Sequence, residues 1–107
     1  MIPLYPEKLL TIITNDSMEE RIVGMFKKYG VSGYTMLRVG GASSSGHESD
    51  MSGFDANILA KVIVPEERLA VLLESCERKL RKGYHLTVYV TDVQVITPDK
   101  FNKSLRR

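Results

Sequence analysis

Short runs of hydrophobic residues alternate along the chain with two segments in which hydrophobic residues recur every three or four positions. The run 8–14 is short, apolar and rich in β-branched residues, which predicts a buried strand. The runs 34–39 and 86–96 predict two more strands. The run 54–64 predicts a longer strand, in which every second residue from the first is apolar and the opposite face is partly polar.

Two amphipathic helices are predicted between these strands. Residues 15–17 offer helix caps, and Ser17 with Glu20 three residues later fits a capping box. The apolar residues of the first helix are Met18, Ile22, Met25, Phe26 and Tyr29. The second helix begins at Pro65 as its first residue. Its expected buried stripe is Leu69, Leu72, Leu73, Cys76 and Leu80. Gly30 and Gly83 are the expected helix stops.

The predicted order is therefore strand, helix, strand, strand, helix, strand. This βαββαβ order is that of the α+β ferredoxin-like sandwich, in which two helices cover one face of an antiparallel sheet. The other face is left without helices, and it still carries apolar groups such as Leu37, Leu59 and Tyr89. An exposed apolar face of this size predicts self-association.

The totals are those of an ordinary small globular domain. At 107 residues, with 43% hydrophobic and 26% charged residues, the chain forms one domain whose small core would gain from oligomerisation. A net charge of +2 and central strands with almost no aromatic residues argue against nucleic acid as a partner. The single cysteine excludes an internal disulfide and indicates a reducing cytoplasm. No signal peptide or membrane span is recognisable.

A glycine- and serine-rich stretch, 40–53, separates the second and third strands. Met51 is its only large apolar side chain, so the stretch cannot contribute to a core. A long loop in so small a domain is usually either functional or disordered. Strands hold its ends while its tip moves, which suits binding or signalling better than rigid catalysis. The last residues, 97–107, are expected to form a basic tail.

The residues with reactive side chains form no convincing catalytic group. His47, Glu48 and Asp50 are either a metal or acid–base cluster or scattered polar residues of a solvated loop, and the flanking glycines favour the second interpretation. Cys76, on the apolar stripe, is interpreted as a core residue. Acylphosphatase-type catalysis is disfavoured because Asp16 follows the first strand and would repel phosphate. No catalytic triad or phosphate-loop motif stands out, so we expect no enzymatic activity.

Two places are suited to an anionic ligand. Gly40 and Gly41 at a strand end would let the backbone approach a ligand closely and direct amides at an anion, with Thr35 and Arg38 just upstream. The alternative is a simple turn. His85, before the last strand, either contacts a phosphate or lies at the rim without a special partner.

The order and spacing of three segments resemble the PII signalling family. Residues 33–35 (Gly-Tyr-Thr) followed by 39–41 (Val-Gly-Gly) are similar to the segment that leads into the PII T-loop. Residues 61–68 (Lys-Val-Ile-Val-Pro-Glu-Glu-Arg) resemble its third strand and second helix start, and residues 89–93 (Tyr-Val-Thr-Asp-Val) its last core strand. The resemblance covers about 9–96, nearly the whole chain.

Three departures distinguish the chain from a standard PII protein. The loop is shorter and contains no tyrosine between Gly40 and Gly53, the B-loop is cut to 82–85, and residues 97–99 replace an arginine pair that clamps ATP phosphates. These departures argue against tight sensing of ATP and 2-oxoglutarate. With these departures, the chain resembles the PII-like branch of SbtB-type and carboxysome-associated proteins, which is linked to uptake of inorganic carbon.

The resemblance implies a homotrimer with an adenine nucleotide in the clefts between subunits. Thr35 would contact adenine in an apolar slot lined by Ile12 and Val62, and the other wall would begin at Gly83. With few arginines, AMP, ADP or cyclic AMP is favoured over ATP. The implied nucleotide-binding residues are Ile12, Thr35, Leu37, Arg38, Gly40, Gly41, Ser43, Val62, Gly83, His85, Leu86 and Thr87.

The function that the resemblance implies is that of a cytoplasmic, non-enzymatic sensor without a resident cofactor. Nucleotide, together with bicarbonate, would change the order of loop 40–53 and so its affinity for a membrane transporter, with a bicarbonate transporter favoured. Two alternatives remain open. One is a metal-dependent nucleotide phosphohydrolase that uses His47, Glu48 or Asp50. The other is a metal-tolerance-type trimer that binds no nucleotide.

Overall fold

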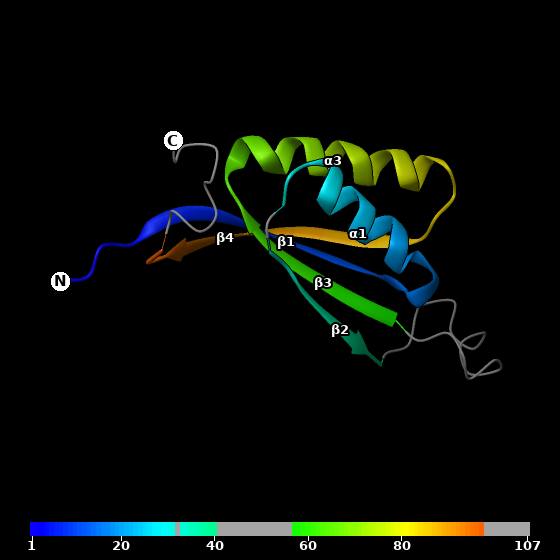
Figure 1. Cartoon of the computed structure of the whole chain (residues 1–107), viewed down its shortest axis with the longest axis horizontal. Helices are drawn as coiled ribbons and strands as arrows, with labels where there is room; N and C mark the ends of the chain where they lie inside the picture. The colour runs from blue at the N-terminus through cyan, green and yellow to red at the C-terminus, as the bar shows by residue number, and fades with distance from the viewer. Residues whose placement is uncertain (32, 41–56, 98–107) are drawn as a thin grey trace.

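The computed structural model describes residues 1–31, 33–40 and 57–97, which form seven elements (Figure 1). The four strands make one antiparallel sheet in the order β2-β3-β1-β4, and both helices lie on the same side of it. The predicted α+β ferredoxin-like sandwich is therefore confirmed. The elements are β1 (Tyr5–Asn15), the 3-10 turn η1 (Asp16–Met18), α1 (Glu19–Lys28), β2 (Thr35–Val39), β3 (Asn57–Val64), α3 (Glu66–Arg81) and β4 (Leu86–Val95).

The core lies between the helices and one face of the sheet. In β3 the predicted alternation holds for every described residue, because Ile58, Ala60, Val62 and Val64 are all buried. Ala60, Val62 and Val64 pack with side chains from β1 and from both helices, which removes a continuous apolar surface from water. The largest fully buried side chains among these partners are Leu10, Ile12, Ile22, Phe26 and Leu72.

The helix-free face of the sheet carries the alternate residues of each strand. Leu37 pairs with Leu59, and Thr11 pairs with Tyr89, so these side chains share the face away from the helices. Leu37 and Tyr89 are exposed, as expected for an apolar face without a helical cover. Thr11 is buried on this face, and its Oγ1 has no hydrogen-bond partner among the described residues.

The starts of both helices differ from the sequence predictions. The capping box of Ser17 and Glu20 is wrong, because η1 precedes α1, Met18 takes the N-cap position and no side chain caps the helix. The Ser17 hydroxyl instead hydrogen-bonds the side-chain oxygen of Asn15. Pro65 was predicted as the first residue of α3 but occupies the N-cap position, with extended backbone, so that the helix begins one residue later at Glu66. The Pro65 carbonyl accepts the first helical hydrogen bonds.

The buried stripe of α3 also ends differently. Leu69, Leu72 and Cys76 are buried and Leu73 is half-buried, as predicted. Leu80, however, is exposed, so its assignment to the stripe is wrong. With 3.6 residues per turn, the inward position after Cys76 is reached at Lys79, which is half-buried. Ser75 is buried beside the stripe instead.

The end of α1 is tied to the start of α3 by one arginine. Gly30 has a φ of 74° and Gly83 a φ of 99°, so both glycines end helices as predicted, in a backbone region that other residues rarely adopt. Arg68 Nη1 donates to the carbonyl oxygens of Tyr29 and Gly30, at 2.8 Å each. These bonds satisfy carbonyls that the end of α1 leaves without helical partners.

Replacing Arg68 with alanine is therefore expected to lower the free energy of unfolding by about 1–2 kcal/mol, because two charge-assisted hydrogen bonds are lost at a partly exposed site. Urea titration followed by circular dichroism measures the change. The matched control is Arg81→Ala, which removes only an exposed i,i+4 pair with Glu77 and should cost no more than about 0.5 kcal/mol. Equal losses of unfolding free energy in the two variants would contradict a stabilising role of the Arg68 hydrogen bonds.

Candidate functional site

The predicted site residues fall into two groups at opposite edges of the sheet. Strand β2, with Thr35, Leu37 and Arg38, forms one edge, and β4, with Leu86 and Thr87, forms the other. The central strands β3 and β1 separate the two groups. No single subunit can therefore bring them around one ligand.

The two groups nevertheless lie at the same end of the sheet. Val39 at the end of β2 pairs with Asn57, which pairs with Asn15 at the end of β1, and the neighbouring Thr14 pairs with Leu86 at the start of β4. In Figure 1 the ends of β2 and β1 and the start of β4 lie at the right of the sheet. A second copy beside the first could therefore bring one edge of its sheet to the other edge of its neighbour.

At the β2 edge, Arg38 has a partner that the sequence did not indicate. Its Nη1 donates to Asp16 Oδ2 at 3.2 Å, across the connection between β1 and α1. The guanidinium is largely exposed, and an exposed ion pair contributes only about 0–1 kcal/mol. The Arg38 guanidinium, two residues before Gly40 in the sequence, is therefore only weakly bound to Asp16.

At the β4 edge, the turn after α3 is fixed by glycine geometry and by one side chain. Gly83 in the left-handed region reverses the chain, and Thr14 Oγ1 donates to the carbonyl oxygen of His85 at 2.7 Å. His85 is exposed, and Thr87 is exposed on the helix-free face, whereas Leu86 points toward the helices and packs on the core. This edge therefore offers backbone and small polar groups more than an apolar pocket.

Two of the predicted residues are buried rather than exposed at either edge, and two others lie outside the described residues. Ile12 and Val62 have exposed fractions of 1% and 2% and lie in the core under the helices, so within one subunit they offer no surface to a nucleotide. Gly41 and Ser43 lie outside the described residues, as do His47, Glu48 and Asp50.

The described residues provide neither a cluster of metal ligands nor a helix that could span a membrane. No group of three or more histidine, cysteine and acidic side chains that could hold a metal occurs within residues 1–31, 33–40 and 57–97. Within the same ranges, neither α1 nor α3 is long and apolar enough to cross a bilayer. Burial raises the pKa of the Cys76 thiol, which agrees with its interpretation as an unreactive core residue.

The strand order β2-β3-β1-β4 and the two helices on one face of the sheet define a ferredoxin-like α+β protein. The model of the family "Nitrogen regulatory protein P-II" matches residues 7–100. The chain therefore belongs to the nitrogen regulatory protein P-II family, as the sequence resemblance implied. Among curated proteins, no significant match was found.

Several solved structures of PII-like proteins are similar to the chain over almost its whole length. CPII from Thiomonas intermedia, bound to ADP and bicarbonate, is 35% identical with a TM-score of 0.82, covering 95% of this chain and 100% of that one. The same protein bound to ADP, AMP and bicarbonate gives 34% identity, a TM-score of 0.80 and coverages of 94% and 98%. A PII-like signalling protein from Thermus thermophilus gives 31% identity, a TM-score of 0.77 and coverages of 94% and 99%.

Proposed function

We propose that the protein is a PII-like sensor that assembles as a homotrimer and binds an adenine nucleotide in each cleft between subunits. The observation that carries this proposal is the division of the site between opposite edges at one end of the sheet. A cyclic trimer joins such unlike edges, since each interface of a ring pairs two different surfaces. The structures of CPII with ADP, AMP and bicarbonate support the choice of ligand.

The proposed contacts follow from where the side chains lie. Thr35, Leu37 and Gly40 would form one wall, with Gly41 and Ser43 continuing it. Gly83, His85 and Thr87 of the neighbouring subunit would form the other, with Leu86 setting their position. Ile12 and Val62 would act only by holding β1 and β3 in place, because both are buried. Arg38 is the proposed phosphate ligand, since its present ion pair is exposed and weak.

The signalling output is proposed to depend on loop 40–53, the T-loop of this family. A bound nucleotide, with bicarbonate, would change the populations of loop conformations, and these conformations would differ in affinity for a partner. The proposed partner is a membrane transporter for inorganic carbon, as expected for the SbtB-type and carboxysome-associated branch. The protein would then act in the cytoplasm as a single-domain regulator rather than as an enzyme, with the tail 97–107 available for recruitment to the membrane.

The first test is calorimetric titration with AMP, ADP, ATP and cyclic AMP, each with and without bicarbonate. Binding near one nucleotide per chain, with ADP or AMP ahead of ATP, is the expected result. Recovery of unchanged ADP would separate the sensor from a metal-dependent phosphohydrolase. No heat of binding with any of the four nucleotides, with or without bicarbonate, would overturn the nucleotide site and favour the metal-tolerance type of trimer.

A variant of Arg38 tests the phosphate ligand directly. Arg38→Gln is expected to weaken ADP binding about tenfold, because one charge-assisted hydrogen bond to phosphate is lost. Asp16→Asn is expected to strengthen binding by up to about fivefold, since it removes a carboxylate that competes for Arg38. The control is Lys27→Gln, which removes the same charge from the exposed end of α1. An unchanged affinity in Arg38→Gln would remove this residue from the site.

A further inference from the structure

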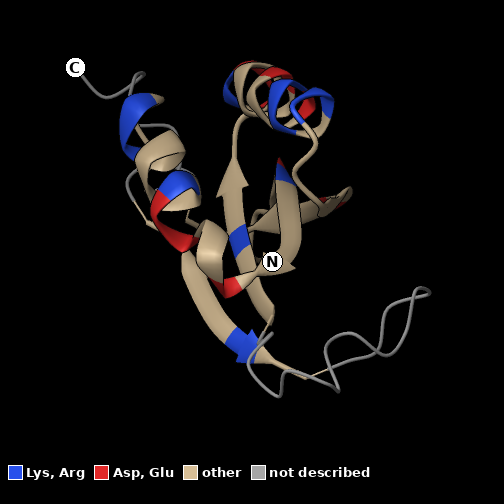
Figure 2. Ribbon diagram, turned by 90° about the vertical axis from the view of Figure 1, so that its right-hand side faces the viewer, with Lys and Arg blue, Asp and Glu red and all other residues tan. Residues whose placement is uncertain are grey.

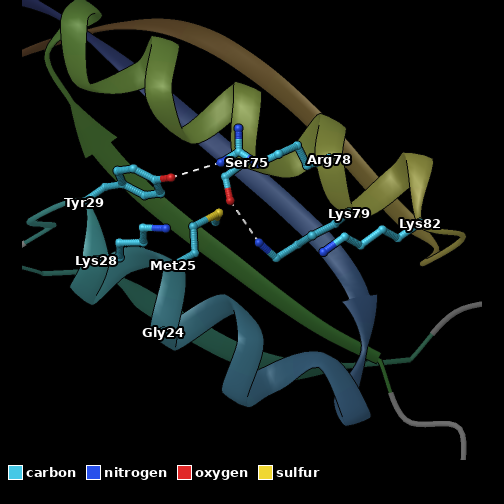
Figure 3. A pocket seen from close by; sticks show the side chains of 8 residues that line it. All are labelled: Gly24, Met25, Lys28, Tyr29, Ser75, Arg78, Lys79 and Lys82. Atoms are coloured by element: carbon cyan, nitrogen blue, oxygen red, sulfur yellow. Dashed lines mark hydrogen bonds between the residues drawn. The ribbon is translucent and has the colours of Figure 1, made fainter.

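A hollow of about 220 Å³ lies between the end of α1 and the second half of α3, on the helical side of the sheet (Figure 3). None of the predicted nucleotide-binding residues lines it. Its polar lining comprises two hydroxyl groups, of Tyr29 and Ser75, and four cationic side chains. The cationic side chains are Lys28, Arg78, Lys79 and Lys82. The hollow is thus separate from the candidate nucleotide-binding residues at the two edges of the sheet.

The cations and hydroxyls at the hollow are already connected. Lys79 Nζ donates to Ser75 Oγ at 2.9 Å, and Arg78 Nη2 donates to Tyr29 Oη at 3.0 Å, as the dashed lines in Figure 3 show. Ser75 is buried, and its Oγ accepts the hydrogen bond from Lys79. Each of the two bonds leaves further donor hydrogens on the ammonium and guanidinium groups free for a ligand. The hollow therefore presents several hydrogen-bond donors, of which Lys79 and Arg78 are positioned by these two bonds.

The positive charge at the hollow is not balanced by any carboxylate of the described residues that lines it. No carboxylate lines the hollow, and none of the four cations belongs to an ion pair between described residues. Arg78 and Lys82 are four residues apart on the helix, a spacing at which like charges repel. Burial, with the neighbouring charges of Arg78 and Lys82, lowers the pKa of Lys79. Figure 2 shows bands of Lys and Arg on both helices. A bound anion would relieve this repulsion.

We propose that this hollow binds a phosphate-type oxyanion, either inorganic phosphate or the phosphoryl group of a small metabolite. Four cations and two hydroxyls converge on it, and an arginine fork with lysine charges is the usual protein complement of phosphate. Pockets for ligands of drug size measure about 300–1,000 Å³, so a hollow of this volume suits a small oxyanion better than a whole nucleotide. The site goes beyond the proposed nucleotide clefts and does not depend on them.

The test is a ¹⁵N–¹H NMR titration of the full chain with inorganic phosphate, compared with sodium chloride at equal ionic strength. The amides of Ser75 and Lys79 are expected to shift saturably with phosphate and not with chloride. Arg78→Gln should weaken binding about tenfold, and the exposed Lys28→Gln provides a second variant. Lys27→Gln, next to Lys28 but outside the hollow, should change the affinity less than about twofold.

Two further arms distinguish the source of the phosphoryl group. Tighter binding of ribose 5-phosphate than of phosphate would identify a phosphorylated metabolite, and equal binding would identify free phosphate. Shifts that phosphate and chloride cause equally, or an affinity unchanged in both Arg78→Gln and Lys28→Gln, would overturn the proposal. ADP titrations of the same variants distinguish the two sites. If only the nucleotide site is wrong, ADP binding fails, but the phosphate-induced shifts of Ser75 and Lys79 remain.

Discussion

Replacing Tyr89 with glutamate is expected to separate the proposed trimer into monomers and to weaken ADP binding at least about a hundredfold. Tyr89 is exposed on the helix-free face, beside the buried Thr11, so the fold of one subunit should tolerate the change. A carboxylate buried there between subunits without a cation would destabilise assembly by several kcal/mol, and a loss of about 2.7 kcal/mol is already a hundredfold. Nucleotide binding should fail with assembly because each cleft needs two subunits.

The matched control is the next residue on the same strand. Val90 has nearly the same exposed fraction as Tyr89, 40% against 46%, but its side chain points to the opposite face of the sheet. Val90→Glu should therefore remain trimeric and bind ADP normally. Sedimentation velocity measures the oligomeric state, and calorimetry measures the affinity. If Tyr89→Glu stays trimeric, or if a monomeric form still binds ADP tightly, the helix-free face or the shared cleft has been misassigned.

The fold could be predicted from the sequence because its signals are local and agree with one another. Alternation along β3 defines the buried face, and Gly30 and Gly83 mark helix ends at positions that require a positive φ. The errors lie where local patterns compete. A 3-10 turn forms where the capping box of Ser17 and Glu20 was predicted. Leu80 was assigned to the buried stripe, but the last inward position of the helix is at Lys79.

The candidate site was less predictable because its residues come from separate strands, and the proposed cleft would join them only between subunits. The pair of Arg38 with Asp16 joins residues 22 positions apart and has no sequence pattern. The resemblance to the family suggested Ile12 and Val62 as ligand contacts, whereas strand alternation alone would have placed both on the core face, with Leu10 and Ala60. The burial of both side chains thus follows from strand alternation, whereas their contact with a ligand stays a prediction.

The most severe loss of stability is expected from shortening a fully buried leucine of α3. Leu72 has an exposed fraction of 0% and packs in the core between α3 and the sheet, so Leu72→Ala should lower the free energy of unfolding by about 2–5 kcal/mol, through lost transfer energy and a residual cavity. That is a large share of the roughly 5–15 kcal/mol typical of a domain. Urea unfolding at fixed protein concentration measures it, with a repeat at tenfold dilution to separate effects of assembly.

The same substitution at Leu80 isolates burial as the cause. Leu80 lies about two turns further along α3 but has an exposed fraction of 44%, so Leu80→Ala changes helix propensity in the same way without opening a cavity. Its cost should stay within about 1 kcal/mol. A loss at Leu80 as large as that at Leu72 would mean that Leu80 is covered in the assembled protein. The sequence pattern would then be right that Leu80 is buried, but the side chain would be buried in a contact between subunits and not in the core of one subunit.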